Sequence, residues 1–179
     1  MSANADAQKR TSFDARNRAA ARLAAVQALY QLDITQDSPD QVIKDFLAGK
    51  VGGLAVMLDS EGEKESVVAL TEFDSELFIN LVRAAQERGS DIDGMIKGSL
   101  AAEWPWDRLE IILRAVLRAG VAELLTRTDI PANATITDFV DVAQAFYAGP
   151  EPGMTNAVLD RIARALDRSG GGRARVAAP

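Results

Sequence analysis

Three arginines gather at the start of a segment with helical periodicity. Arg16, Arg18 and Arg22 lead the run RNRAAARLAAVQALYQ, residues 16–31, in a chain that is acidic overall, with 20 Lys+Arg against 26 Asp+Glu. Residues four apart share one face of a helix, so Arg18 and Arg22 are expected side by side. We therefore predict a local anion-binding surface. Solvated charges on an exposed helix face are the competing interpretation.

The composition excludes most kinds of catalytic and metal-binding site. The chain has no cysteine, so disulfides and thiolate metal sites are excluded. It also has no histidine, the commonest general base and the commonest metal ligand. Acid pairs such as Asp91 and Asp93 lack further ligands and are interpreted as helix caps. We expect no enzymatic activity, no metal site and no cofactor.

The sequence gives no sign of a membrane or secretory protein. No apolar run approaches the roughly 20 residues that span a bilayer. The N-terminal stretch MSANADAQKR lacks the hydrophobic core of a secretory signal. A cytoplasmic protein without a membrane partner is expected.

Helical spacing of apolar residues recurs along most of the chain. Hydrophobic residues make up 47% and aromatic residues only 6%, which favours helix packing over a sheet-based fold. We predict an all-α protein with no strand and about seven helices, at residues 14–34, 38–49, 74–88, 91–100, 107–125, 135–146 and 154–168. In the first helix, Ala19, Leu23, Val26 and Tyr30 are expected on the inner face. In the fifth, Gly120 is expected to permit close approach of another helix.

The remaining segments divide the chain. Residues 1–13 are predicted to be a disordered arm, residues 50–71 a loop insertion with at most a short ordered piece, and residues 169–179 a flexible tail. The interval 14–168 then forms one helical domain, with subdomains of roughly 14–103 and 104–168. The break between them is the Trp-Pro-Trp sequence that begins at Trp104.

Three ordered segments resemble the NusB family of bacterial transcription antitermination factors. The first is RLAAVQALYQ at residues 22–31, similar to the family's arginine-led AVQALYQ opening. The second runs from 107 to 131 and contains DRL, AVLR, EL and DIP, and the third is NAVLDRIA at 156–163. Together with the intervening helices they cover about residues 14–168. The resemblance implies a NusB-like bundle of two packed helical subdomains.

The same resemblance implies partners and a function. The family binds the boxA element of nascent ribosomal RNA transcripts as a heterodimer with the ribosomal protein NusE. That pair joins NusA, NusG and RNA polymerase, and the scheme requires no enzymatic activity. An arginine guanidinium binds phosphate bidentately and stacks on bases, which suits single-stranded RNA.

The resemblance also implies site residues. Arg18 and Arg22 match arginines of the RNA-binding arm, Tyr30 matches the family tyrosine, and Phe146 matches the aromatic residue that closes the penultimate helix. Core or rim packing is the competing interpretation for both aromatic residues. Arg16 is added because it compensates for two family arginines that are alanines here. Those positions are Ala19 and Ala20, and Met154 stands where relatives carry an aromatic residue.

Two other functions are compatible with the residues. The chain could be a helical protein-interaction module whose arginines have no RNA role. It could also be a stand-alone relative of the N-terminal domain of ribosomal RNA cytosine methyltransferases. The glycine-rich tail that begins near Ser169 is followed by no methyltransferase fold, which argues against that activity.

Overall fold

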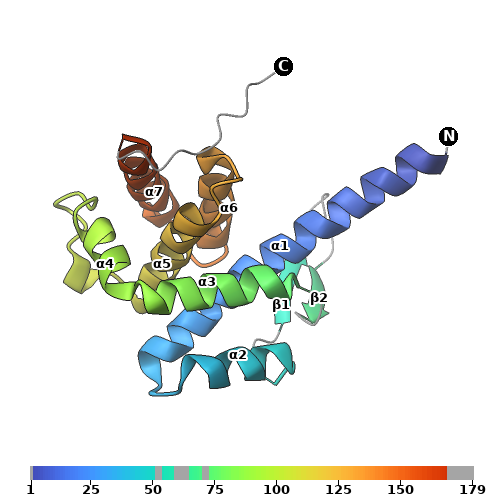
Figure 1. Cartoon of the computed structure of the whole chain (residues 1–179), viewed down its shortest axis with the longest axis horizontal. Helices are drawn as coiled ribbons and strands as arrows, with labels where there is room; N and C mark the ends of the chain where they lie inside the picture. The colour runs from blue at the N-terminus through green and yellow to red at the C-terminus, as the bar shows by residue number, and fades with distance from the viewer. Residues whose placement is uncertain (1, 51–53, 59–64, 70–72, 169–179) are drawn as a thin grey trace. The chain divides into compact units, whose positions relative to one another are not determined.

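Seven α-helices account for most of the residues that the structure describes. The computed structural model describes residues 2–50, 54–58, 65–69 and 73–168. Within those residues the helices and a short 3-10 helix, η1, follow one another in chain order (Figure 1): α1 (Ser2–Ile34), α2 (Pro39–Leu47), α3 (Ser75–Glu87), α4 (Gly89–Lys97), η1 (Trp106–Arg108), α5 (Ile111–Thr126), α6 (Ala132–Gln144) and α7 (Glu151–Arg168). The prediction of about seven helices is confirmed.

Two short strands correct the prediction of a chain without β-structure. β1 (Leu54–Leu58) pairs antiparallel with β2 (Glu65–Ala69), with Leu54 opposite Ala69 and Leu58 opposite Glu65. Val56 and Val67 pair in this ladder, and β-branched residues favour strands. Each strand has only five residues, too short to show a clear period beside the charged segment that joins them. The neighbouring Gly52 and Gly53 lie outside the described residues.

The first helix begins earlier than expected. α1 starts at Ser2, so the structure is helical over the arm that was predicted to be disordered. The reason is visible in the composition: residues 2–16 contain no glycine or proline and are rich in alanine, the strongest helix former. The predicted flexible tail, residues 169–179, lies outside the described residues.

The inner face of α1 is also rotated from the predicted one. Ala19 and Tyr30 are exposed, and Leu23 is only half-buried. The buried residues of this part of the helix are mostly alanines, at 21, 24, 25 and 28, together with Val26 and Leu29. Small side chains allow the closest approach of a neighbouring segment, so the alanine-rich side is the one that packs.

Proline marks the start of two helices that were predicted to begin later. α6 starts at Ala132, directly after Pro131, and α7 starts at Glu151 with Pro152 in its first turn. Proline fits the first turn of a helix, where its missing N–H would have no partner. The predicted start of α2 is confirmed, since Ser38 caps it by accepting a hydrogen bond from the Gln41 amide at 3.2 Å.

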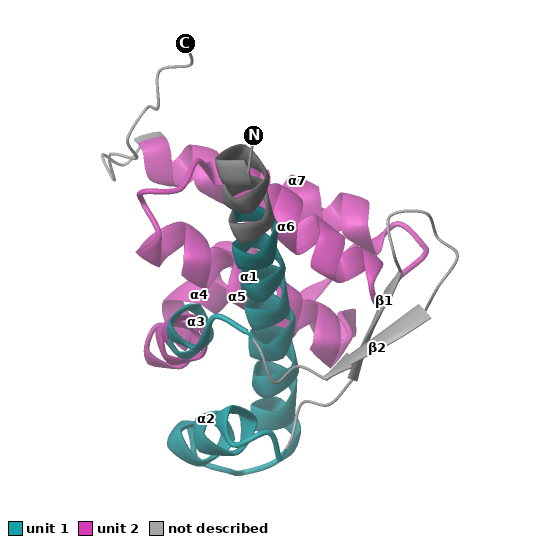
Figure 2. Cartoon of the chain, turned by 90° about the vertical axis from the view of Figure 1, so that its right-hand side faces the viewer, with its two compact units in different colours: residues 1–79 teal, residues 80–179 magenta. Residues whose placement is uncertain are grey.

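The chain divides into two units at a different place from the predicted one. Unit 1 comprises residues 1–79 and unit 2 residues 80–179 (Figure 2), whereas the predicted boundary lay near 103. α4 belongs to unit 2 because it packs on α5 and α7. Polar contacts reinforce this: Arg118 binds Asp93 through two hydrogen bonds, and Arg161 donates to the Ser99 carbonyl at 2.6 Å.

Unit 1 has an aromatic centre. The Phe46 ring of α2 stacks on Phe78 at a centroid distance of 5.5 Å, and Phe73 meets Phe78 edge-on at 5.1 Å. Val42 and Ile43 on α2 are buried beside Phe46 in the sequence. The main-chain N–H of Asp74 donates to the Asn17 carbonyl at 3.1 Å, which ties the start of α3 to α1.

Unit 2 is built around α5, which packs against α4, α6 and α7. A Cβ placed on Gly120 would lie 3.0 Å from both methyl carbons of Leu159 on α7 and 3.4 Å from the Phe139 ring on α6. Those distances are shorter than ordinary van der Waals contact, so the missing side chain is what lets the three helices pack. The expected role of Gly120 is confirmed.

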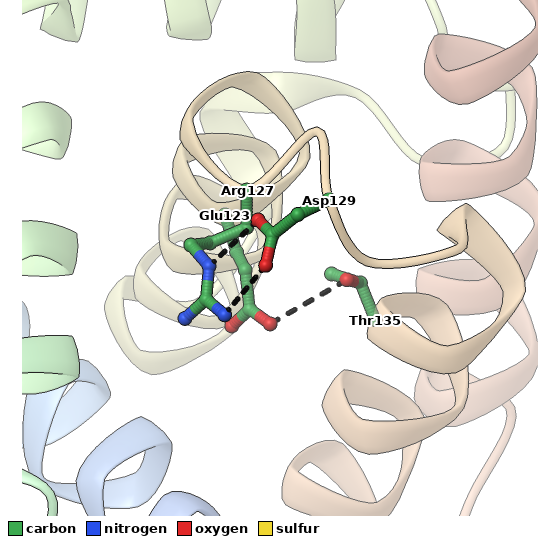
Figure 3. A network of polar contacts seen from close by, with 4 residues as sticks. All are labelled: Glu123, Arg127, Asp129 and Thr135. Carbon is green, nitrogen blue, oxygen red and sulfur yellow. Dashed lines mark hydrogen bonds and ion pairs between the residues drawn. The ribbon is translucent and has the colours of Figure 1, made fainter. Parts of the chain in front are cut away.

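A polar network closes the turn between α5 and α6 (Figure 3). Glu123 is completely buried, and the Thr135 hydroxyl donates to its Oε1 at 3.4 Å. Arg127 donates from Nε and Nη2 to the two carboxylate oxygens of Asp129, each at 3.0 Å. The Arg127 guanidinium lowers the pKa of the exposed Asp129 carboxyl below its usual value. The DIP segment thus serves to fix this turn.

Candidate nucleic-acid interface

The α1 arginines differ sharply in exposure. Arg16 is exposed and Arg18 half-exposed, whereas only 4% of Arg22 is accessible. Arg22 is engaged by interactions within the chain, as a buried charge must be. Arg16 and Arg18 form no ion pair with any described residue. The structure therefore leaves two of the three predicted arginines available to an anion, and it places the third in the interior.

An exposed aromatic residue accompanies the accessible arginines, and sequence reasoning missed it. Residues 11–16 of α1 are all exposed, and 53% of Phe13 is accessible. Phe13 precedes Arg16 by three residues, so the two share one face of the helix. A phenylalanine in a polar, exposed stretch three residues before an arginine is the signal that could have identified it.

Tyr30 lies at the surface of unit 1. It is 40% accessible, and the exposed Ile34 follows one helical turn later. The interpretation of Tyr30 as a core residue is therefore wrong. Its ring is accessible for stacking, and its position at the end of the buried alanine face makes it a rim residue.

Phe146 lies in the turn after α6 and is 39% accessible. The next residue fixes this turn: the Tyr147 hydroxyl donates to Glu110 Oε2, just before α5, at 3.1 Å. Burial raises the pKa of Tyr147 well above its usual value, and the hydrogen bond to the Glu110 carboxylate adds to the shift. Tyr147 therefore remains a neutral donor, and the neighbouring Phe146 ring stays on the surface of unit 2.

Other predicted features add no further contact. Met154, where the family resemblance implies an aromatic residue, is buried in unit 2. The described residues contain no group of three side chains that could hold a metal ion. Among them, no helix has the length and apolar character that would take it across a membrane.

Each unit carries groups that can bind a single-stranded nucleic acid in chemical terms. Guanidinium groups bind phosphates, and exposed aromatic rings stack on bases with little sequence preference. Unit 1 supplies Arg16, Arg18 and Tyr30, and unit 2 supplies Phe146. The predicted site residues thus come from both units, and all except Arg22 are accessible.

Comparisons with known proteins find relatives over most of the chain. The NusB family model matches residues 19–164. The transcription antitermination protein NusB of Rhodospirillum rubrum is 53% identical over 161 residues, which cover 86% of this chain and 87% of that protein. The corresponding protein of Caulobacter vibrioides is 41% identical over 147 residues, covering 82% and 92% of the two chains.

Solved structures show the same fold. NusB of T. maritima superposes with a TM-score of 0.63 at 27% identity, covering 82% of this chain and 90% of that one. A structure of the antitermination factors NusB and NusE in complex with double-stranded RNA matches with a TM-score of 0.62 at 25% identity, covering 84% and 98%. The family match spans most of the helical residues, and several relatives exceed one-third identity over most of their length. The chain belongs to the NusB family.

Proposed function

We propose that this chain is a transcription antitermination factor that binds the boxA element of nascent ribosomal RNA transcripts as a heterodimer with NusE. The observation that carries the proposal is the match to a solved NusB–NusE–RNA complex over nearly the whole of that NusB chain. The accessible arginines and aromatic rings support it, because they have the chemistry that single-stranded RNA requires. The family resemblance extends the assembly to NusA, NusG and RNA polymerase, in the cytoplasm.

The proposed contacts divide by chemistry. Arg16 and Arg18 bind phosphates, and both lie in the accessible N-terminal part of α1. Tyr30 and Phe146 stack on bases, since each presents about two-fifths of its surface. Arg22 supports the arm from inside the unit, because only 4% of it is accessible.

The chain acts in this scheme by binding alone. Its relatives are named as antitermination proteins, and the chain lacks the histidine and cysteine side chains on which many active sites depend. The proposed function therefore requires no catalytic residue, metal or cofactor.

Fluorescence anisotropy tests the proposal. The chain, alone and with NusE, is titrated into labelled boxA RNA and into a scrambled RNA of equal length and composition, at one stated salt concentration. We expect preference for boxA, and tighter binding when NusE is present. Equal affinity for the two RNAs in the presence of NusE would count against boxA recognition.

A protein-interaction role without RNA is the second candidate, and the burial of Arg22 favours it. It predicts that NusE binds the chain normally while neither RNA binds the pair above the background of a charge-matched control protein. The same titration therefore separates the two functions.

A further inference from the structure

Trp106 lies among three cationic side chains in unit 2. The ring centroid is 5.1 Å from Lys97 Nζ, 5.0 Å from Arg114 Cζ and 5.6 Å from Arg118 Cζ. Trp106 belongs to η1, Lys97 ends α4, and the two arginines lie one turn apart on α5. We call these four residues the Trp106 cluster. Each cation lies within the distance at which an aromatic ring attracts a positive charge.

The charges of the cluster are not balanced. Arg118 is neutralised by Asp93, through hydrogen bonds of 2.7 Å from Nε and 2.9 Å from Nη2. In the part of the chain that the structure describes, Lys97 and Arg114 pair with no carboxylate. Arg114 Nη2 makes one long hydrogen bond, 3.4 Å, to the main-chain carbonyl of Asp107. Two positive charges therefore remain beside one ring, on a chain whose formal net charge is −6.

A purely structural role accounts for only part of this cluster. The Arg118–Asp93 pair already joins α5 to α4, and Arg161 holds the Ser99 carbonyl just beyond α4. Lys97 is exposed and adds no polar contact within the described chain. Lys97 and Arg114 both lie against one ring, and like charges repel one another. The surplus charge is explained if the cluster receives an anion.

The surface next to the cluster indicates which anion. Arg114 follows Glu110 by one helical turn, and Glu110 accepts the hydrogen bond of Tyr147, the neighbour of Phe146. Ile111, on the same stretch, is also exposed. The Phe146 turn thus meets the start of α5 one helical turn before Arg114, within a single unit. An arginine that lies over an aromatic ring still presents N–H groups at its edge to a phosphate.

We propose that Lys97 and Arg114 bind phosphates of an RNA segment that continues past the base stacked on Phe146. The inference rests on the proposed RNA function and extends that site along unit 2. The Trp106 ring positions the two cations, and Asp93 keeps Arg118 from competing for the same phosphates. The expected contribution is electrostatic and independent of RNA sequence.

The test compares RNAs of two lengths on the NusE complex. Lys97→Gln with Arg114→Gln removes both surplus charges and keeps most of each side-chain stem. The RNAs are boxA alone and boxA extended by about ten nucleotides at each end, a length within reach of one binding surface. Two phosphate contacts to a single strand contribute a salt slope of about 1.4, or about 25-fold in affinity at ~0.1 M salt.

We expect the double variant to bind the extended RNA about 25-fold more weakly than the wild type, with a salt slope lower by about 1.4. Its affinity for boxA alone should equal that of the wild type. The matched control is Lys44→Gln with Arg164→Gln, which removes two exposed charges elsewhere and should change neither affinity. Lys97→Gln alone is the second variant, because it alters one exposed side chain at a helix end. This variant should bind the extended RNA about fivefold more weakly than the wild type, which corresponds to one phosphate contact.

Three results would overturn the inference. Wild-type affinity of the double variant for the extended RNA excludes phosphate contacts at the cluster, although the proposed function stands if boxA still binds. A loss of NusE binding by the double variant, measured in the absence of RNA, assigns the cluster to an acidic protein surface instead. Failure of the wild type to bind boxA with NusE present removes the proposed function, and the inference falls with it.

Discussion

Replacing Arg16 and Arg18 together by glutamine should weaken RNA binding while leaving the fold as stable as before. Neither side chain is buried, and neither forms an ion pair with a described residue. Surface substitutions of this kind change the free energy of unfolding by about 0.5 kcal/mol or less. Two lost phosphate contacts on a single strand lower the salt slope by about 1.4, which corresponds to ~2 kcal/mol of binding free energy at 0.1 M salt.

Arg22→Gln should give the opposite pattern. Only 4% of Arg22 is accessible and it is engaged by an interaction within the chain, so the substitution removes that interaction from the interior. We expect a loss of about 2–4 kcal/mol in the free energy of unfolding. For a chain of this size, that lowers Tm by roughly 5–15 °C. The salt slope of RNA binding should stay at the wild-type value below the new Tm.

The assay pairs thermal unfolding, followed by circular dichroism, with anisotropy titrations at four salt concentrations in the presence of NusE. Lys44→Gln, which removes one exposed charge from α2, is the control for both readouts. The reasoning is refuted if Arg22→Gln flattens the salt dependence at unchanged Tm. It is equally refuted if the Arg16 and Arg18 double variant keeps the wild-type slope.

Three further predictions concern packing, pH and stacking. Gly120→Val should destabilise the chain by about 3 kcal/mol in urea titrations, because added carbons would overlap Leu159; an unchanged midpoint would contradict the packing. The raised pKa of Tyr147 means that the folded chain holds its phenolic proton more tightly than the unfolded chain. Stability is therefore full below the ordinary pKa of 10.0 and falls above it, and Tyr147→Phe should flatten that alkaline loss in denaturant titrations at pH 9 to 11. Phe146→Ala should cost about 1–3 kcal/mol of RNA binding with an unchanged Tm, and a loss of Tm instead would indicate a packing role.

The sequence was sufficient where a signal is local. Ser38 followed by Pro39 correctly places the start of α2, because a capping side chain and a fixed proline dihedral act on adjacent residues. Gly120 on an apolar stripe correctly predicts close helix packing, since few other roles suit a glycine in the middle of a buried helix. The NusB resemblance likewise depends on ordered local segments, and the family match confirms it.

The buried side of a helix and the unit to which a helix belongs were harder to predict. Arg22 lies three and seven residues before Ala25 and Leu29, so the spacing that places it beside Arg18 also places it on the buried side. Which side of α1 packs depends on other segments, such as α2, and not on the sequence of α1 alone. The same holds for α4, which belongs to unit 2 because it packs on α5 and α7, two helices that come later in the chain.

The strand pair and the early start of α1 were not predicted from the sequence, for a different reason. Five-residue strands between charged and glycine-containing segments carry too few positions for a period of two to stand out. The N-terminal residues carry a high helix propensity, but their lack of apolar periodicity favoured the prediction of disorder.

Cross-linking tests the central claim most directly. Photoactivatable boxA RNA is bound to the complex of this chain with NusE, irradiated, and the linked residues are identified by mass spectrometry. We predict links at the exposed part of α1 that carries Arg16 and Arg18, and at the Phe146 turn. Links confined to other surfaces, such as the exposed side of α7 around Arg164, would contradict the account.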